Sequence, residues 1–372
     1  MAHVVFILGA GASQPGGCPV MSDFFDQARR LGEKNLLGDF QSDYSFVEEV
    51  RDTLDNAHKR SRFEIQNLEI ILNLIETGDL LGKQHVLGEL NLPKTRECLV
   101  RLVAGVLERK QQFDSNALPD ILADGDGEII QNPPSAHAPL KRVGPVGYDE
   151  LARLIRSLQH HDPQFSCDFV TFNYDLGLEL SLWARKVEWR YGTSTLGNGP
   201  VGIFKVHGSV GWTTKEDVNC TPFRESAQQF LDTPINHKDL HTARFSLRAF
   251  SQMGGRYVPL IVPPSENKAL HRDQFSSMWK QAGVSIGRAN IIAVAGYSLP
   301  QTDQFVRHWF SLSNASTSLL RHVHLCDASS NALTTWTTLL GKPVEEKIKT
   351  SNDFRYFARD IWDKFRTRGL LW

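Results

Sequence analysis

The chain has 372 residues, a formal net charge of −1 and 41% hydrophobic residues. This length allows a large buried core, and the near-neutral charge gives no overall field that would attract nucleic acid or an anionic membrane. The five cysteines are scattered without a CxxC pair, which argues against a zinc ribbon or a disulfide framework and favours a reducing cytoplasm. Since no segment approaches the roughly 20 apolar residues of a membrane helix, we expect a soluble cytoplasmic protein.

The amino terminus predicts a buried strand followed by a phosphate-binding loop. Residues 4–8 form an unbroken apolar run, which is typical of a strand buried on both faces. The loop that follows contains Gly9, Ala10, Gly11 and Ser13. A helical pattern then begins near Ser22, and a strand, glycine turn and helix bring backbone N–H groups up to a pyrophosphate. A simple tight turn is the alternative, because Gln14 replaces the third glycine of the GxGxxG fingerprint.

Residues 30–147 predict a helical and loop insertion within a single domain that spans residues 1–372. The pattern from Ser22 to about residue 108 is helical, with apolar side chains at three- and four-residue steps over residues 65–75. That stretch favours a packing helix, and Glu69 on it is the alternative candidate for an acid that lines a site. Residues 111–147 contain Asp-Gly, Pro-Pro and Gly-Pro pairs, which predict a long loop.

The remaining hydrophobic runs predict further strands that alternate with helices. Strands are expected over residues 168–172, 187–190, 201–206, 257–264 and 290–295, and in a run that ends at Asp327. Helices are expected over residues 148–159, 176–183 and 273–285, and amphipathic helices close the chain. Residues 213–256 lack periodicity and predict a loop excursion. The alternation favours an α/β fold with a Rossmann-like, doubly wound and mostly parallel sheet.

Polar or glycine residues follow four of the predicted strands. The segments are the first loop, residues 173–175, residues 207–209 and residues 296–298. Each has an ordinary structural explanation, such as a turn-forming asparagine or a structural histidine. Because the carboxyl ends of parallel strands form one ligand-binding crevice, we expect the four segments to meet.

In their order, these segments resemble the sirtuin-like superfamily, in which a GAGxS loop, a TxNxD segment, an HG histidine and a GxS loop build one nicotinamide dinucleotide site. The matching segments here are residues 9–13, 171–175, 207–208 and 296–298. The deacylases of that superfamily carry a four-cysteine zinc module after the HG motif, where this chain has Cys220 alone. They also have an aromatic–arginine pair where Pro19, Val20 and Met21 stand here. The chain is therefore more similar to the sirtuin-like NADases of prokaryotic antiphage defence, which lack the zinc ribbon.

The resemblance implies an NAD+ hydrolase that cleaves the nicotinamide–ribose bond, with NAD as substrate and without zinc. Asn173 is expected to orient water and the ribose, since its amide both donates and accepts hydrogen bonds. His207 is expected to take a proton from that water or from a ribose hydroxyl, since imidazole titrates near neutrality. Asp175 supports the carboxamide or the positive charge, or instead caps a helix.

The resemblance also implies where the rest of the dinucleotide lies. The first loop, with the Ser13 hydroxyl, is expected to hold the diphosphate. Gly296 and Ser298 are expected along the phosphate–adenosine half, and Asp327 on the adenosine ribose.

Since unrestrained NAD hydrolysis would kill its host, the family further implies gated activity in abortive infection. We expect homo-oligomerisation and an activating partner, such as a HerA-type ATPase, or activation within a nucleic-acid-guided system. Two alternatives stay open. One is an NAD-dependent protein deacylase or ADP-ribosyltransferase, and the other is a non-catalytic module that senses a nucleotide.

Overall fold

The computed structural model describes residues 3–57, 65–82, 91–111, 145–163, 165–192, 201–213, 259–262, 272–300, 303–315, 320–328, 332–340, 346–351 and 353–367. Within them lies a seven-stranded sheet of order β3-β4-β2-β1-β7-β8-β9, in which every neighbouring pair is parallel. The strands are β1 (His3–Leu8), β2 (Ser166–Thr171), β3 (Trp189–Tyr191), β4 (Val201–Lys205), β7 (Ile291–Ala295), β8 (His322–Cys326) and β9 (Glu346–Ser351). The predicted α/β, Rossmann-like class is confirmed.

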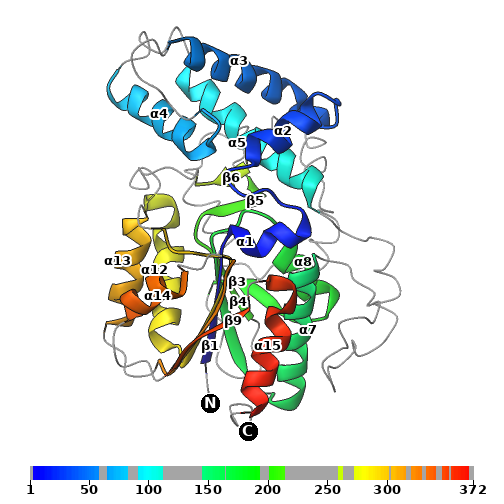
Figure 1. Cartoon of the computed structure of the whole chain (residues 1–372), viewed down its shortest axis with the longest axis vertical. Coiled ribbons are helices and arrows are strands. Elements are labelled where there is room, and N and C mark those ends of the chain that lie inside the picture. The colour runs from blue at the N-terminus through cyan, green and yellow to red at the C-terminus, as the bar shows by residue number, and fades with distance from the viewer. Residues whose placement is uncertain are drawn as a thin grey trace, which may run out of the picture.

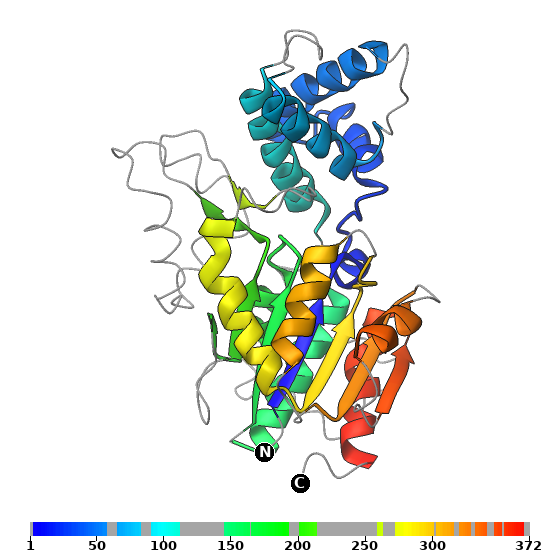
Figure 2. The same cartoon turned by 90° about the vertical axis from the view of Figure 1, so that its left-hand side faces the viewer.

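Helices cover both faces of the sheet, as Figures 1 and 2 show. One face carries α7 (Val146–His161), α8 (Gly177–Ala184) and α15 (Phe354–Thr367), and the other carries α12 (Arg272–Arg288), α13 (Gln304–Asn314) and α14 (Ala332–Leu340). From β1 the chain passes to β2 and to the edge strand β3, comes back to β4 between them, and then crosses to β7 on the other side of β1. The direction of winding therefore reverses between β1 and β7, and ligands of open α/β sheets bind at such a point.

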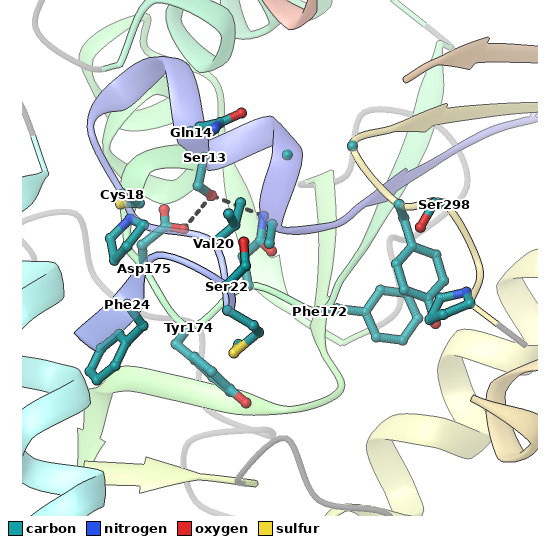
Figure 3. A pocket seen from close by; sticks show the side chains of 18 of the residues that line it. Ser13, Gln14, Cys18, Val20, Ser22, Phe24, Phe172, Tyr174, Asp175 and Ser298 are labelled. Carbon is teal, nitrogen blue, oxygen red and sulfur yellow. Dashed lines mark hydrogen bonds between the residues drawn. The ribbon is translucent and has the colours of Figure 1, made fainter. Parts of the chain in front are cut away.

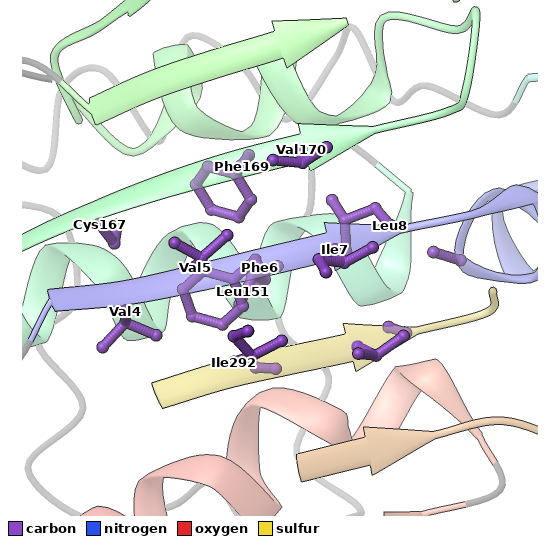
Figure 4. Packing of buried hydrophobic residues seen from close by; sticks show 14 of the residues in the cluster. Val4, Val5, Phe6, Ile7, Leu8, Leu151, Cys167, Phe169, Val170 and Ile292 are labelled. Carbon is purple, nitrogen blue, oxygen red and sulfur yellow. The ribbon is translucent and has the colours of Figure 1, made fainter. Parts of the chain in front are cut away.

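The apolar run of β1 explains its central place in the sheet. Figure 4 shows its side chains between those of β2 and β7, and none of residues 4–8 is more than 1% exposed. The ring of Phe6 stacks on Phe169, with 4.9 Å between the centroids. Burying such a side chain contributes about 1.5–3 kcal/mol, so a strand that is apolar on both faces is stable only where helices cover both faces.

A second layer of helices stands beyond the carboxyl ends of the strands (Figure 1). This helical layer consists of α2 (Phe24–Gly32), α3 (Gln41–Ala57), α4 (Leu68–Leu80) and α5 (Leu92–Lys110). It has a hydrophobic core of its own, to which Phe25, Leu72 and Leu102 contribute. The layer starts with α2, ahead of the insertion boundary expected at residue 30. The long loop predicted for residues 111–147 lies largely outside the described residues, and the division into one domain stays a prediction.

Two strands differ from expectation. The run at residues 257–264 was expected in the main sheet, but β6 (Pro259–Ile261) pairs antiparallel with β5 (Gly208–Thr213) in a separate two-stranded sheet. The chain turns sharply after β4, where Gly208 has a φ of 82°, and the next strand leaves the main sheet. At the carboxyl terminus β9 adds an edge strand between α14 and α15. The sequence of β9, EKIKTS, is polar, so no apolar run predicted a strand there. An edge strand needs little apolar surface.

Two further points concern the expected segments. The excursion expected over residues 213–256 lies outside the described residues except for Thr213. Within the described part of the chain, no helix combines the length and the apolar character needed to cross a lipid bilayer.

Candidate functional site

A cavity of about 980 Å³ lies between the carboxyl ends of the strands and the helical layer. The loops that follow β1, β2, β4, β7 and β8 all contribute to its lining, together with α4 and α5. The predicted site residues that line it are Ala10, Gly11, Ser13, Asn173, Asp175, His207, Gly296, Ser298 and Asp327. The fold therefore brings together nearly all of the residues singled out from the sequence. Gly9 is not among the lining residues and contributes to the site through its backbone.

The first loop is a short helix, α1 (Ala10–Ser13), packed against the loop after β7. The Gly9 N–H donates to the carbonyl of Ala295 at 2.9 Å, and the Gly11 N–H donates to the carbonyl of Gly296 at 3.0 Å. Gly296 has a φ of +62°, and a Cβ atom there would lie 2.2 Å from the backbone nitrogen of Ala12. These glycines let two loops touch through their backbones, and the Gly11 N–H is engaged by protein rather than directed at a ligand.

The Asn173 side chain is fixed by a buried hydrogen-bond network. Its Nδ2 donates to the carbonyl of Gly9 at 2.7 Å and lies 2.9 Å from both Ser13 Oγ and the Tyr148 hydroxyl. Because a carbonyl oxygen only accepts, this contact decides which end of the amide is nitrogen. The donor half of the amide is therefore engaged within the protein, and Oδ1 is the group through which Asn173 can accept a hydrogen bond.

Asp175 is held by its neighbours on both carboxylate oxygens. Oδ2 accepts from the Ser13 hydroxyl at 2.5 Å, a contact drawn in Figure 3. Oδ1 accepts from Gln111 Nε2 and from the Gly177 N–H at the start of α8, each at 2.8 Å. The helix-capping role is thus the one visible in the contacts. The Ser13 hydroxyl, expected on a diphosphate, donates to this carboxylate instead.

Tyr148, on α7, belongs to the same network and was not singled out from the sequence. Its hydroxyl lies 2.8 Å from Ser13 Oγ, and the side chain is almost fully buried. Burial, reinforced by the charge of Asp175, raises the pKa of the phenol well above its usual range. Tyr148 therefore stays a neutral hydroxyl that holds Ser13 and Asn173 in place. The helical periodicity of the sequence does not distinguish Tyr148 as a site residue, because the apolar face of a helix accepts a tyrosine as readily as a leucine.

His207 lies in the turn between β4 and β5 and is surrounded by aromatic rings. Its ring centroid is 5.1 Å from that of Phe172, 5.9 Å from that of Trp279 and 6.4 Å from that of Tyr174. The His207 carbonyl accepts from the Val262 N–H at 2.8 Å, which ties the turn to β6. The side chain is 9% exposed, so the imidazole faces the cavity from a largely apolar setting.

The Phe172 ring also stacks on Tyr297, with 4.2 Å between the centroids and 16° between the planes. Phe172 follows β2 and Tyr297 follows β7, and Figure 3 shows the Phe172 ring close to the loop that carries Ser298. The stacked pair joins the loops that follow β2 and β7, and both rings line the cavity.

A buried ion pair supports the strand ends from behind. Lys205 Nζ lies 2.9 Å from Glu179 Oε1 and also donates to the main-chain carbonyl of Asp175. The Tyr191 hydroxyl donates to the same Glu179 oxygen at 3.1 Å. The pair was not predicted, although a lysine within the apolar run VGIFKV is a signal that could have revealed it, because lysine is rarely buried without a partner.

The part of the cavity next to β8 and α15 is lined by polar and charged residues. Asp327 is buried just after β8, whereas Ser298 is exposed. Asp353 and Arg355, at the start of α15, form an ion pair with 2.8 Å between Arg355 Nε and Asp353 Oδ2. Glu69, in the helical layer, lines the cavity. Its position therefore agrees with the alternative interpretation of this stretch, an acid that lines a site.

Among the described residues, no group of three or more His, Cys, Asp or Glu side chains is arranged to hold a metal ion. Comparisons of the sequence with models of protein families and with curated proteins found no match.

Proposed function

We propose that this chain hydrolyses NAD+ at the nicotinamide–ribose bond and releases nicotinamide and ADP-ribose. The observation that carries the proposal is the convergence of Asn173 and His207, from different strands, on the cavity that the first loop also lines. The resemblance of these segments to sirtuin-like sites supplies the substrate class. The aromatic side chains of Phe172 and Tyr297 in the lining are compatible with a ligand that contains a planar ring.

In the proposed reaction, the bond between the ribose C1′ and the pyridinium nitrogen breaks, and its electron pair leaves with nicotinamide. The leaving group thus departs neutral and needs no strong general acid, while the ribose becomes an oxocarbenium-like cation. A water oxygen then bonds to C1′ and loses a proton. His207 accepts that proton, and Asn173 Oδ1 orients the water by accepting a hydrogen bond from it. The engaged amide nitrogen keeps Oδ1 in one orientation.

The proposal extends to the setting of the reaction. An NAD+ hydrolase of this kind fits antiphage defence by abortive infection, in which loss of NAD stops the infected cell. Its activity must then be gated, and we propose homo-oligomerisation together with an activating partner such as a HerA-type ATPase. The comparison of turnover by the purified chain, alone and with such a partner, tests this. A monomer that is fully active alone would count against gating.

The central test measures nicotinamide release from NAD+ by chromatography for His207→Ala and Asn173→Ala. We expect each variant to lose roughly 10²–10⁴-fold in turnover, since proton transfer and water orientation are removed. His308→Ala is the matched control, because His308 is an exposed histidine on α13 outside the cavity. Thermal unfolding of each variant checks that the fold is kept.

Normal turnover by His207→Ala would refute the proposed role of the imidazole. Formation of acetyl-ADP-ribose with an acetylated peptide would favour the deacylase. Calorimetric binding of NAD+ without turnover, in the presence of every candidate activator, would favour a sensing module.

A further inference from the structure

The proposed hydrolysis requires Asn173 to present its amide oxygen to the attacking water, and this inference rests on that proposed function. An asparagine side chain presents either an oxygen or an NH2 group, according to how its amide is turned. The side chains that turn it here are buried, since none is more than 7% exposed. They are Ser13, Tyr148, Asn173 itself and Asp175.

The carboxylate of Asp175 fixes the first proton of this network, because a carboxylate accepts hydrogen bonds and does not donate them. Its Oδ1 accepts from the Gly177 N–H at 2.8 Å, and its Oδ2 accepts from the Ser13 hydroxyl at 2.5 Å (Figure 3). A hydroxyl has a single proton, so Ser13 Oγ can only accept hydrogen bonds from its other neighbours.

The next proton is fixed as a consequence. The Tyr148 hydroxyl, 2.8 Å from Ser13 Oγ, donates its proton to that oxygen. With this proton committed, the Tyr148 oxygen can only accept from Asn173 Nδ2, which lies 2.9 Å away. Ser13 Oγ also accepts from Nδ2 at 2.9 Å. Both hydroxyl oxygens therefore need a donor from the amide of Asn173, and the donor group of that amide is its NH2.

The carbonyl of Gly9 is the second determinant of the orientation, because it accepts from Asn173 Nδ2 at 2.7 Å. Two hydrogens thus serve three acceptors, and one hydrogen is shared. With the Asp175 carboxylate in place, a turned amide would set its oxygen against all three acceptors. Without that carboxylate, both hydroxyls can reverse and donate to the turned amide, and the Gly9 carbonyl alone opposes it.

We propose that Asp175 is a positioning residue for the reaction. Its carboxylate acts through Ser13 and Tyr148 and sets the direction of the hydrogen bonds that leave Asn173 Oδ1 as the acceptor for the attacking water. In this role Asp175 contacts neither the ribose nor the nicotinamide. The amide of Asn173 is therefore oriented before NAD+ binds.

Asp175→Asn tests the role of the charge, because it keeps the shape of the side chain. The Gly177 N–H still needs an acceptor, so the oxygen of the introduced amide stays there and its NH2 group faces Ser13. The Ser13 proton must then turn toward Tyr148 or Asn173. We expect kcat for nicotinamide release to fall on the order of 10²-fold, with KM within about 3-fold of wild type.

Ser13→Ala breaks the same connection and is expected to lower kcat in the same way. Asp175→Asn added to Ser13→Ala should then change kcat by less than about 3-fold, because the two residues act as one unit. Asp55→Asn, an exposed change on α3, is the matched control and should match wild type. Thermal unfolding shows whether each variant is folded.

Three kinetic results would overturn the proposal. The first is a kcat of Asp175→Asn within about 3-fold of wild type, and the second is a rise in KM alone, because that result describes a binding contact. The third is an equally large fall in kcat when Asp175→Asn is added to Ser13→Ala, since Asp175 would then act without Ser13.

Nuclear magnetic resonance of the full chain, labelled with ¹⁵N at asparagine, reports the amide orientation without turnover. The side-chain signals of Asn173 are assigned by their absence in Asn173→Ala. A turned amide directs its NH2 group into the cavity, so we expect these protons to exchange with solvent at least about 10-fold faster in Asp175→Asn and in Ser13→Ala.

Unchanged exchange in both variants would overturn the role of Asp175 and leave the hydrolase proposal intact. Wild type that binds NAD+ and releases no nicotinamide in any assembly would overturn the proposed function itself. The catalytic purpose of the network would be overturned with it, whatever the exchange rates show.

Discussion

The sheet and the helical layer contribute to the cavity in different ways. The sheet side supplies polar groups that are hydrogen-bonded to one another, such as Asn173, Ser13 and Tyr148. The helical layer supplies mostly apolar lining, such as Val103 and Leu107, together with the carboxylate of Glu69. A buried network of hydrogen bonds holds its members in one geometry. The comparison indicates that the sheet side fixes the orientation of the polar groups and that the helical layer encloses the cavity.

The boundary between the two regions does not follow the chain. Tyr174, Val210 and Ile261 belong by sequence to the strand ends or to the small β5–β6 sheet, yet they pack in the hydrophobic core of the helical layer. The Tyr174 hydroxyl donates to the Val262 carbonyl at 2.7 Å, which ties the same region together. The helical layer therefore packs directly on the small β5–β6 sheet.

The largest effect that tests this comparison is expected from one alanine in each region. Gly296→Ala adds a Cβ atom 2.2 Å from a backbone nitrogen, at a φ of +62°. The unfavourable φ costs about 1–2 kcal/mol and the overpacking about 1–3 kcal/mol, so we expect a loss of about 3 kcal/mol in the free energy of unfolding. Gly82→Ala, just after α4, has a φ of +59° with no heavy atom within 4 Å, and is expected to cost only the first amount.

Urea unfolding of both variants measures the difference between them. Equal losses would mean that the loops after β1 and β7 move apart at little cost. The sheet side of the site would then be less rigid than its hydrogen bonds indicate.

A middle-sized effect is expected from Tyr148→Phe. The change removes the hydroxyl that contacts Ser13 and Asn173, and it should lower the free energy of unfolding by about 1–2 kcal/mol. Since Asn173 then loses part of its support, we expect kcat for nicotinamide release to fall about 10-fold with KM little changed. Tyr356→Phe on the exposed side of α15 is the control and should change neither quantity. Unchanged kcat in Tyr148→Phe would show that Asn173 is positioned without Tyr148.

The smallest effect is expected from Asp353→Asn, where the cavity is lined by the start of α15. The hydrogen bonds from Arg355 hold the pKa of the Asp353 carboxyl below its usual range. A carboxyl whose pKa is lower in the folded state stabilises the fold above its ordinary pKa of about 3.9, and that contribution disappears as pH falls through the folded value. Because the pair is partly exposed and screened by solvent, the variant should lose less than about 1 kcal/mol at neutral pH.

The measurement is urea unfolding of both proteins at neutral pH and at a series of lower pH values, over which the difference should shrink as the Asp353 carboxyl becomes protonated in the folded state. Asparagine keeps the capping oxygen that accepts the Arg355 N–H, so the charge alone is removed. A difference that persists at low pH would point to packing rather than charge.

Local sequence was a good guide where one strand carries its own signal. The unbroken apolar run of β1 predicted a central buried strand, and the polar residues after β2 and β4 predicted side chains that meet at the carboxyl ends. Both features depend on neighbouring residues and on a general rule of parallel sheets. The fold class and the gathering of Asn173 and His207 in one cavity were therefore within reach of the sequence.

Individual contacts were not within reach. The sequence predicted that the first loop and residues 296–298 meet, but the contact of Asn173 with Tyr148 joins segments whose pairing depends on the whole topology. Edge strand β9 lacked an apolar signal, and the run at residues 257–264 carried one although it pairs outside the main sheet. Periodicity shows that a segment is buried, but it does not show against what.

The carboxylate of Asp175 also connects the two regions. It accepts hydrogen bonds from the Ser13 hydroxyl of the first loop, from the side-chain amide of Gln111 just after α5, and from the first N–H of α8. Ser13 in turn accepts a hydrogen bond from the amide of Asn173. A continuous series of hydrogen bonds therefore connects the end of α5 in the helical layer with Asn173 at the proposed reaction centre.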